Sequence, residues 1–218
     1  MDGQGSMTHI YLVRHGQTDW NKEEIFRGTT DIPLNEMGRM EAQLASEALR
    51  AMPVKAVYSS PLARAKETAT AIADCHGLDV RIIEGFQDIC FGDWQGVSHK
   101  TVQKQYPDLY RLWLEDPYAV TFPGGENLEA VQTRAVKAVR EIVSDHPEDT
   151  VVVVSHRVTN RALICGVAGI RLSRFWQLGQ DTAAINLLTW KKDYFTLACL
   201  NDTCHLQSVE KNRMKIDF

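Results

Sequence analysis

Two histidines each stand one residue after a strongly apolar segment of the chain, and each has an arginine as a direct neighbour. Residues 10–13 lead into His15, and residues 151–154, all valine, lead into His156. In an open α/β sheet, the carboxyl ends of buried parallel strands meet at one rim, where such folds place their ligand sites. Imidazoles gathered with guanidinium groups at this rim indicate nucleophilic or acid–base chemistry on an anionic substrate.

Composition narrows the classes of protein that carry such a site. The chain has 218 residues, 44% of them hydrophobic, which is enough for one sizeable core. It contains no apolar run of membrane-spanning length, and its first residues lack the pattern of a secretory signal, so we expect a soluble cytoplasmic protein and no membrane partner. The net charge of −4 and the absence of a basic run argue against nucleic acid.

The cysteines argue against a metal centre. There are five, an odd number, and they show none of the paired spacings of zinc ligands. We expect buried, reduced thiols and no metal.

Alternating strand and helix patterns predict the α/β fold class, with three layers, α/β/α, around a mostly parallel central sheet. The helix after residue 60 is expected to begin with Ser60 as its cap and Pro61 in its first turn. The expected strands are 9–13, 54–58, 80–83, 151–154, 183–190 and 194–200, and the expected helices are 36–52, 61–75, 127–145 and 158–168.

The segments between these elements suggest how the chain is organised. Residues 16–35 and 85–96 are too polar and glycine-rich for regular structure and are long for simple connectors. Residues 96–125, interrupted by prolines, are expected to form a lid-like excursion over the site. Residues 1–6 look like a leader or an expression remnant, and residues 7–218 are expected to form a single domain.

Five motifs, in order along the chain, carry a resemblance to a known family. They are Leu12-Val13-Arg14-His15-Gly16-Gln17-Thr18 with Asn21, Tyr58-Ser59-Ser60-Pro61-Leu62-Ala63-Arg64-Ala65, Phe91-Gly92-Asp93-Trp94-Gln95-Gly96, Pro123-Gly124-Gly125-Glu126, and Val154-Ser155-His156. Together they resemble the histidine phosphatase superfamily and its phosphoglycerate mutase-like branch. The resemblance implies the phosphoglycerate mutase-like fold and an enzyme that forms a phosphohistidine.

The resemblance and the chemistry of phosphoryl transfer agree on the central residues. His15 is expected to be the nucleophile, with its other ring nitrogen held by a backbone carbonyl and its neutral form favoured by nearby arginines. Arg14 and Arg64, matched to the family's RHG and SSPLxRA patterns, should grip phosphoryl oxygens through their forked guanidinium groups. His156 should complete the phosphate pocket, with Asn21 and the backbone at Gly16 as further donors.

Further assignments concern the proton donor and the organic half of the substrate. The family places a carboxylate four residues before the glycine of its FGxWxG element, which here is Asp88 where glutamate is usual. Glu84 and Glu126 are reserve candidates. Arg27 and Arg157 depart from the family pattern and suggest a charged or carboxylated substrate. His205 resembles a closing element of some metal-independent phosphoserine phosphatases.

The sequence therefore favours a metal-independent phosphatase, without cofactor, acting on a small phosphorylated metabolite. Phosphoserine, α-ribazole phosphate and 3-phosphoglycerate are candidate substrates. A phosphoglycerate mutase is the first alternative, disfavoured because residues 96–123 lack the longer basic insertion of the mutases. A catalytically weak phosphate-binding regulatory module is the second. A nucleotide-binding protein is disfavoured because neither glycine-rich phosphate motif occurs. Whether the protein is a monomer or a homodimer is left open.

Overall fold

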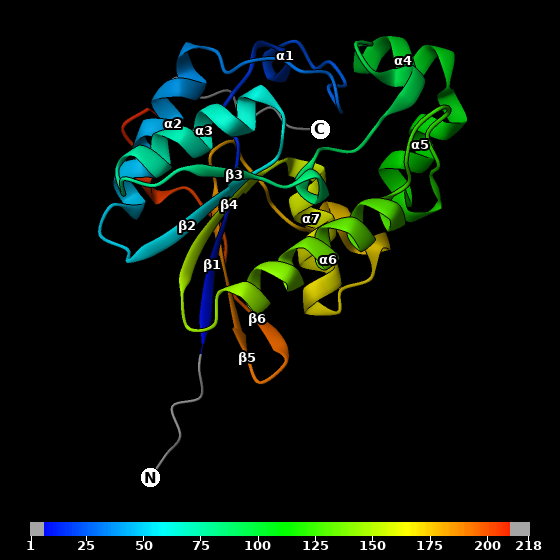
Figure 1. Ribbon diagram of the computed structural model, residues 1–218. Helices are drawn as coiled ribbons and strands as arrows, with labels where there is room; N and C mark the ends of the chain where they lie inside the picture. Colours follow the sequence, from blue (N-terminus) through cyan, green and yellow to red (C-terminus); the bar gives the residue numbers. More distant parts are fainter. Residues whose placement is uncertain (1–6, 210–218) are drawn as a thin grey trace.

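The computed structural model describes residues 7–209, so the expected leader at residues 1–6 lies outside the described residues. Within this range six strands form one sheet in the order β3-β2-β4-β1-β5-β6 (Figure 1). Strands β3, β2, β4 and β1 are mutually parallel, β5 is antiparallel to β1, and β6 is antiparallel to β5. The strands are β1 (Thr8–Arg14), β2 (Val54–Ser59), β3 (Val80–Ile82), β4 (Thr150–Ser155), β5 (Ile185–Lys191) and β6 (Tyr194–Asp202).

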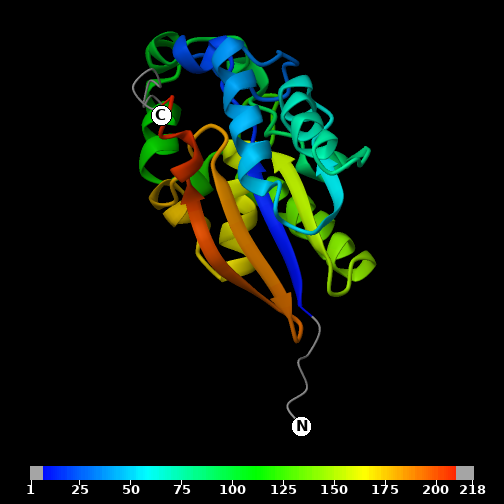
Figure 2. The same ribbon diagram turned by 90° about the vertical axis from the view of Figure 1, so that its left-hand side faces the viewer.

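Helices cover both faces of the sheet, which confirms the predicted three-layer α/β/α class (Figures 1 and 2). Helices α2 and α3 pack together on one face, and α6 and α7 pack together on the other. Every residue of β4 is buried, as expected for a central strand covered on both sides. The α-helices are α1 (Asp19–Lys22), α2 (Glu36–Leu49), α3 (Ala63–Asp74), α4 (His99–Gln105), α5 (Pro107–Glu115), α6 (Leu128–Asp145) and α7 (Arg157–Ala168).

The start of α3 differs from the sequence-based prediction. The helix begins at Ala63 with Leu62 in the cap position, so Pro61 precedes the helix and Ser60 does not cap it. The first backbone N–H of the helix, that of Ala63, instead donates to the Asp31 carboxylate at 2.7 Å. A side chain from a distant loop thus satisfies the helix end, which local sequence patterns cannot reveal.

A cluster of aromatic side chains joins the 96–125 excursion to the main core. Trp94 and Trp113 are both buried, and the Phe122 ring lies between them, with centroid distances of 5.0 Å to Trp94 and 5.2 Å to Trp113. Phe91 packs edge-on to Phe122 at 4.9 Å. Helices α4 and α5 therefore rest on an apolar wall continuous with the sheet's own core.

Two other sequence-based expectations can be assessed. All five cysteines lie within the described residues and are free thiols, but only Cys165 is buried, so the expectation of generally buried thiols is wrong. Cys90 lies on a loop and Cys199 on the edge strand β6, and both are partly exposed. Cys204 is exposed. Among residues 7–209, no helix combines the length and apolar character needed to cross a bilayer.

Candidate active site

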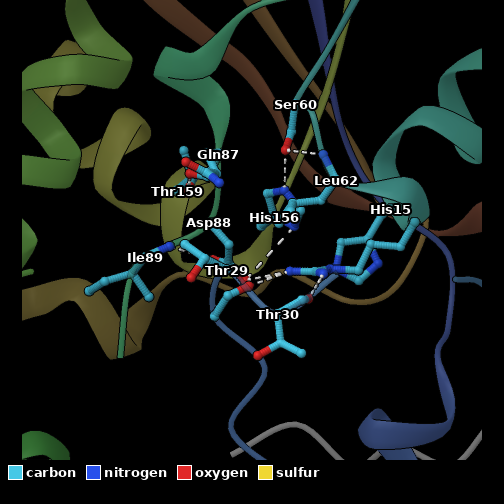
Figure 3. A network of polar contacts seen from close by, with 12 residues as sticks. His15, Thr29, Thr30, Ser60, Leu62, Gln87, Asp88, Ile89, His156 and Thr159 are labelled. Atoms are coloured by element: carbon cyan, nitrogen blue, oxygen red, sulfur yellow. Dashed lines mark hydrogen bonds and ion pairs between the residues drawn. The ribbon is translucent and has the colours of Figure 1, made fainter. Parts of the chain in front are cut away.

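The adjacent strands β1 and β4 bring the two histidines together at their carboxyl ends. Arg14, the last residue of β1, is the register partner of Ser155, the last residue of β4, and one histidine follows each of them. The ring centroids of His15 and His156 are 5.1 Å apart with an angle of 57° between the ring planes (Figure 3). Both side chains are almost fully buried, at 1% and 0% exposure.

The His15 ring is oriented by its own loop. Its Nδ1 lies 2.6 Å from the carbonyl oxygen of Gly16. A carbonyl can only accept, so Nδ1 carries the proton and Nε2 keeps its lone pair in the neutral ring. Gly16 also packs so closely on helix α2 that an added Cβ would lie 2.3 Å from the Gly38 carbonyl oxygen. Only glycine fits at this approach, and the nucleophile loop is held against the helix.

Burial, followed by the charges of Arg64, Arg14 and Arg27, holds the pKa of His15 well below its usual value, although the bond to the Gly16 carbonyl opposes the shift. Desolvation penalises the imidazolium, and each guanidinium repels it. His15 is therefore neutral at physiological pH, as nucleophilic attack by an imidazole requires.

Arg64, in the first turn of α3, is fully buried beside the histidines and is held by backbone carbonyls. Its Nη1 donates to the Thr30 oxygen at 2.9 Å and its Nη2 to the Gly28 oxygen at 2.7 Å. The same Nη2 lies 3.3 Å from Oδ2 of Asp88. The guanidinium is thus fixed in one plane before any substrate binds.

Arg14 is also fully buried, and its Nη1 donates to the Gln180 carbonyl oxygen at 2.5 Å. Its charge lowers the pKa of His15, so the guanidinium lies within electrostatic range of that ring. Two fixed cations therefore act on the space around the His15 imidazole.

His156 has a hydrogen-bond partner that the sequence did not identify. Its Nε2 lies 2.7 Å from the hydroxyl oxygen of Ser60, a residue at 0% exposure that follows β2 (Figure 3). Burial first, and then the charges of Arg64, His15, Arg134 and Arg27, hold the pKa of His156 well below its usual value. Both imidazoles of the site are therefore uncharged.

Asp88 lies at the site, with only 6% of the residue exposed. Its Oδ2 is 3.3 Å from Arg64 Nη2 and 3.8 Å from His156 Nδ1, and its Oδ1 accepts from the Ile89 backbone at 3.0 Å. The reserve carboxylates lie elsewhere: Glu84 is exposed, and Glu126 is engaged with an arginine.

That arginine, Arg134 on α6, holds the segment that carries Asp88, and sequence reasoning missed it. Its guanidinium donates to the carbonyl oxygens of Gly85 at 3.0 Å, Gln87 at 2.6 Å and Asp88 at 3.1 Å. It also forms a two-pronged pair with Glu126, at 3.0 and 3.1 Å. Glu126 lies before the N-terminal cap of α6, so no helical spacing in the sequence signalled this pair.

A cavity opens beside Asp88, and four of the predicted site residues line it: Asn21, Arg27, Asp88 and Arg157, with Glu24 and His99 as further polar members. Asn21 is nearly buried, and its Oδ1 accepts from the backbone and hydroxyl of Thr18, both at 2.9 Å. Its Nδ2 has no hydrogen-bond partner among the described residues. This amide nitrogen is a donor available to a ligand in the cavity beside Asp88.

The comparisons with known proteins address the family directly. The profile of the histidine phosphatase superfamily (branch 1) matches residues 10–203. The chain belongs to this superfamily. It is 36% identical over 200 residues to phosphoserine phosphatase 1 of Hydrogenobacter thermophilus, covering 92% of this chain and 95% of that protein.

Solved structures of superfamily members superpose closely on this histidine phosphatase. Bacillus stearothermophilus YhfR has a TM-score of 0.88 at 30% identity, covering 92% of this chain and 100% of that one. A mycobacterial glucosyl-3-phosphoglycerate phosphatase has a TM-score of 0.84 at 29% identity, covering 90% and 100%. These findings confirm the predicted fold and the prediction of a phosphoric monoester hydrolase that works through a phosphohistidine.

Six predicted site residues of this histidine phosphatase do not line the described cavity: Arg14, His15, Gly16, Arg64, His156 and His205. His205, in the short turn Cys204–Leu206, has its Nε2 3.1 Å from the Ala183 carbonyl oxygen and does not belong to the described cavity lining. The backbone N–H of Ala183 in turn donates to the His15 carbonyl at 3.2 Å. His205 is thus connected to the nucleophile loop through the backbone of one intervening residue.

Proposed function

We propose that this protein hydrolyses a small phosphomonoester without a metal ion, by transferring the phosphoryl group first to His15 and then to water. The hydrogen bond from His15 Nδ1 to the Gly16 carbonyl carries this proposal. It leaves Nε2 as the nucleophilic nitrogen of a neutral ring, in a site where the guanidinium groups of Arg14 and Arg64 are buried.

In the first step, His15 Nε2 attacks phosphorus in line with the ester oxygen. The P–N bond forms, the P–O ester bond breaks, and the leaving alkoxide takes a proton from Asp88. Arg14, Arg64 and His156 neutralise or donate to the phosphoryl oxygens as charge develops on them, with Asn21 Nδ2 as an additional donor. The backbone N–H of Gly16, expected to be a further donor, instead donates to the Thr68 hydroxyl at 3.1 Å. The products are a free alcohol and a phosphohistidine.

In the second step, a water molecule attacks the phosphohistidine. Asp88, now ionised, takes a proton from that water while the new P–O bond forms and the P–N bond breaks. Inorganic phosphate leaves and His15 is restored with its lone pair. The shorter side chain of Asp88, compared with glutamate, is compensated by the backbone clamp of Arg134, which fixes the segment close to Arg64.

We propose a small carboxylated phosphomonoester, such as phosphoserine or a phosphoglycerate, as the substrate class. Arg27 and Arg157 both line the cavity beside Asp88, which is where the organic part of a bound ester lies once its phosphate meets His15. Similarity to a phosphoserine phosphatase and to a glucosyl-3-phosphoglycerate phosphatase supports the same class. His205 is proposed to support the nucleophile loop through Ala183 rather than to bind substrate.

Phosphate release from phosphoserine, 3-phosphoglycerate and α-ribazole phosphate, measured with excess EDTA present, tests the proposal. We expect turnover of at least one ester in EDTA and a loss of more than about a thousandfold in His15→Ala. His76→Ala, which removes a histidine outside the site, is the matched control and should keep wild-type activity. Reactions quenched with alkali or with denaturant should contain an acid-labile, base-stable phosphoryl group on residue 15.

Three results would contradict the proposal. Phosphate binding without turnover of any ester indicates a regulatory module. Turnover that depends on added 2,3-bisphosphoglycerate indicates a mutase. Undiminished hydrolysis by His15→Ala removes the nucleophile from the mechanism. The cytoplasmic location, the state of assembly and the covering role of residues 96–125 stay predictions.

A further inference from the structure

The contacts of Ser60 define which way its hydroxyl proton points. Its Oγ accepts a hydrogen bond from the backbone N–H of Leu62 at 3.3 Å and lies 2.7 Å from Nε2 of His156 (Figure 3). A backbone N–H can only donate, so the Leu62 contact uses a lone pair of the hydroxyl oxygen. The hydroxyl proton is left to be donated, and Ser60 is completely buried.

Among the described residues, His156 Nε2 is the acceptor in hydrogen-bond range of that proton. If Nε2 itself carried a proton, the Ser60 hydroxyl would be left without an acceptor in a fully buried position, which costs free energy. If Nε2 is unprotonated, both groups are satisfied by a single hydrogen bond. The Ser60 side therefore favours the tautomer of His156 that carries its proton on Nδ1.

The opposite edge of the ring favours the same tautomer independently. Nδ1 of His156 lies 3.8 Å from Oδ2 of Asp88 and has no hydrogen-bond partner among the described residues. An N–H bond directed toward a carboxylate is electrostatically favourable, whereas a nitrogen lone pair in that position is repelled. Nδ1 also faces the side of the ring where Arg64 meets Asp88.

We infer that Ser60 is a positioning residue, which donates its hydroxyl proton to His156 Nε2 and so fixes the tautomer that presents Nδ1–H to the phosphoryl oxygens. The catalytic consequence of this inference rests on the proposed function, but the tautomer itself does not. The two imidazoles of the site then have opposite roles toward the phosphoryl group, one as a nucleophile and one as a hydrogen-bond donor. His15 has its proton on Nδ1 and offers a lone pair, and His156 has its proton on Nδ1 and offers that N–H.

An uncharged donor has an advantage at this position. An imidazolium at His156 would repel the Arg64 and Arg134 guanidinium groups that surround it, which is why those charges, after burial, depress its pKa. A neutral ring with the correct tautomer supplies a hydrogen bond without that repulsion. A neutral ring with the wrong tautomer would direct a lone pair at an anionic oxygen.

Long-range ¹H–¹⁵N correlation spectra of the free protein test the inference directly. In uniformly ¹⁵N-labelled wild-type protein at about pH 7.5, a unit above the ordinary histidine pKa, we expect the His156 ring to show Nδ1 as the protonated nitrogen. In Ser60→Ala, the Nε2 signal should move and a fraction protonated at Nε2 should appear. Ser59→Ala, which removes a buried hydroxyl that donates to the Ser60 carbonyl at 2.8 Å, should leave both nitrogen signals unchanged.

Steady-state kinetics provide a second test of the role of Ser60. Ser60→Ala should lower kcat/KM about tenfold, the size expected for a lost orienting hydrogen bond, and Ser60→Thr, which keeps the hydroxyl, should restore most of it. A wild-type spectrum with Nε2 protonated, or an unchanged His156 pattern in a folded Ser60→Ala protein, would overturn the inference. Neither result would affect the phosphohistidine mechanism, which is tested separately by the turnover of esters and by His15→Ala.

Discussion

The neutral state of the two buried histidines predicts a measurable dependence of stability on pH. For both residues the pKa in the folded protein lies well below the ordinary value, mainly because of burial and then because of Arg64. In the unfolded chain each histidine titrates near its ordinary pKa of about 6.5. Below that pH the unfolded state binds more protons than the folded state, so the free energy of unfolding falls as the pH falls.

The size of the change in the free energy of unfolding follows from the histidine pKa of the unfolded chain. Between pH 7.5 and pH 5.5, each histidine that stays neutral in the folded state removes about 1.4 kcal/mol from the free energy of unfolding. The two together remove about 2.7 kcal/mol, a sizeable fraction of the stability of an ordinary domain. The contribution is absent above about pH 7.5 and grows as the pH falls toward the depressed folded-state pKa values.

Urea unfolding at the two pH values and equal ionic strength measures this contribution. The loss of stability between the two pH values should be about 1.4 kcal/mol smaller in His15→Asn and in His156→Asn than in the wild type. Asn21→Ser removes a nearly buried polar side chain of the same site that does not titrate, and it should keep the wild-type pH dependence. Identical pH dependence in the wild type and both histidine variants would refute the conclusion that these rings are neutral in the folded state.

Three further predictions follow from single contacts. Arg64→Lys cannot keep both bonds to the Gly28 and Thr30 carbonyls together with a phosphoryl contact, so kcat/KM should fall by about 100-fold or more; a loss below threefold would contradict this. Tm should also fall, because a backbone carbonyl loses its partner. Asp88→Asn should slow hydrolysis of phosphoserine far more than that of p-nitrophenyl phosphate, whose leaving group needs no proton, and equal losses would exclude the acid role. Gly92→Ala, at φ 53° and with its Cβ 2.0 Å from the Pro123 oxygen, should cost about 3 kcal/mol or more in urea unfolding. The control Gly77→Ala has a similar φ and open space around it, so its cost should stay near 1–2 kcal/mol.

The order of strands and helices could be predicted from the sequence because it depends on local patterns. The valine run of β4 and the apolar stripe of α6 can be recognised in the sequence. Asn35 caps α2, as its position before the helix predicts, and its side chain accepts from Gly38 N at 2.9 Å. The short helix α1 within the expected 16–35 loop was missed because four residues carry too little periodic signal.

The parts of the site that the sequence could not reveal depend on contacts between distant segments. Ser60 reads as a helix cap, and only the pairing of β2 with β4 shows that its hydroxyl faces His156. Arg134 reads as one more charged residue on a half-exposed helix, and its three carbonyl contacts require the fold of the 85–88 segment. Types of residue can be predicted from motifs, whereas the groups that orient them come from tertiary structure.

The aromatic side chains of Trp113 and Trp176 suggest a way to change the substrate range of this enzyme. The Arg157 guanidinium lies 5.7 Å from the centroid of the Trp176 ring, and the Trp176 indole N–H donates to the Trp113 carbonyl of α5 at 2.7 Å. Arg157, which we propose to contact the organic part of the ester, is therefore held through Trp176 by helix α5, and α5 does not line the cavity. Libraries built on α5 and on residue 176 would retune discrimination between esters while leaving the phosphoryl-transfer residues intact.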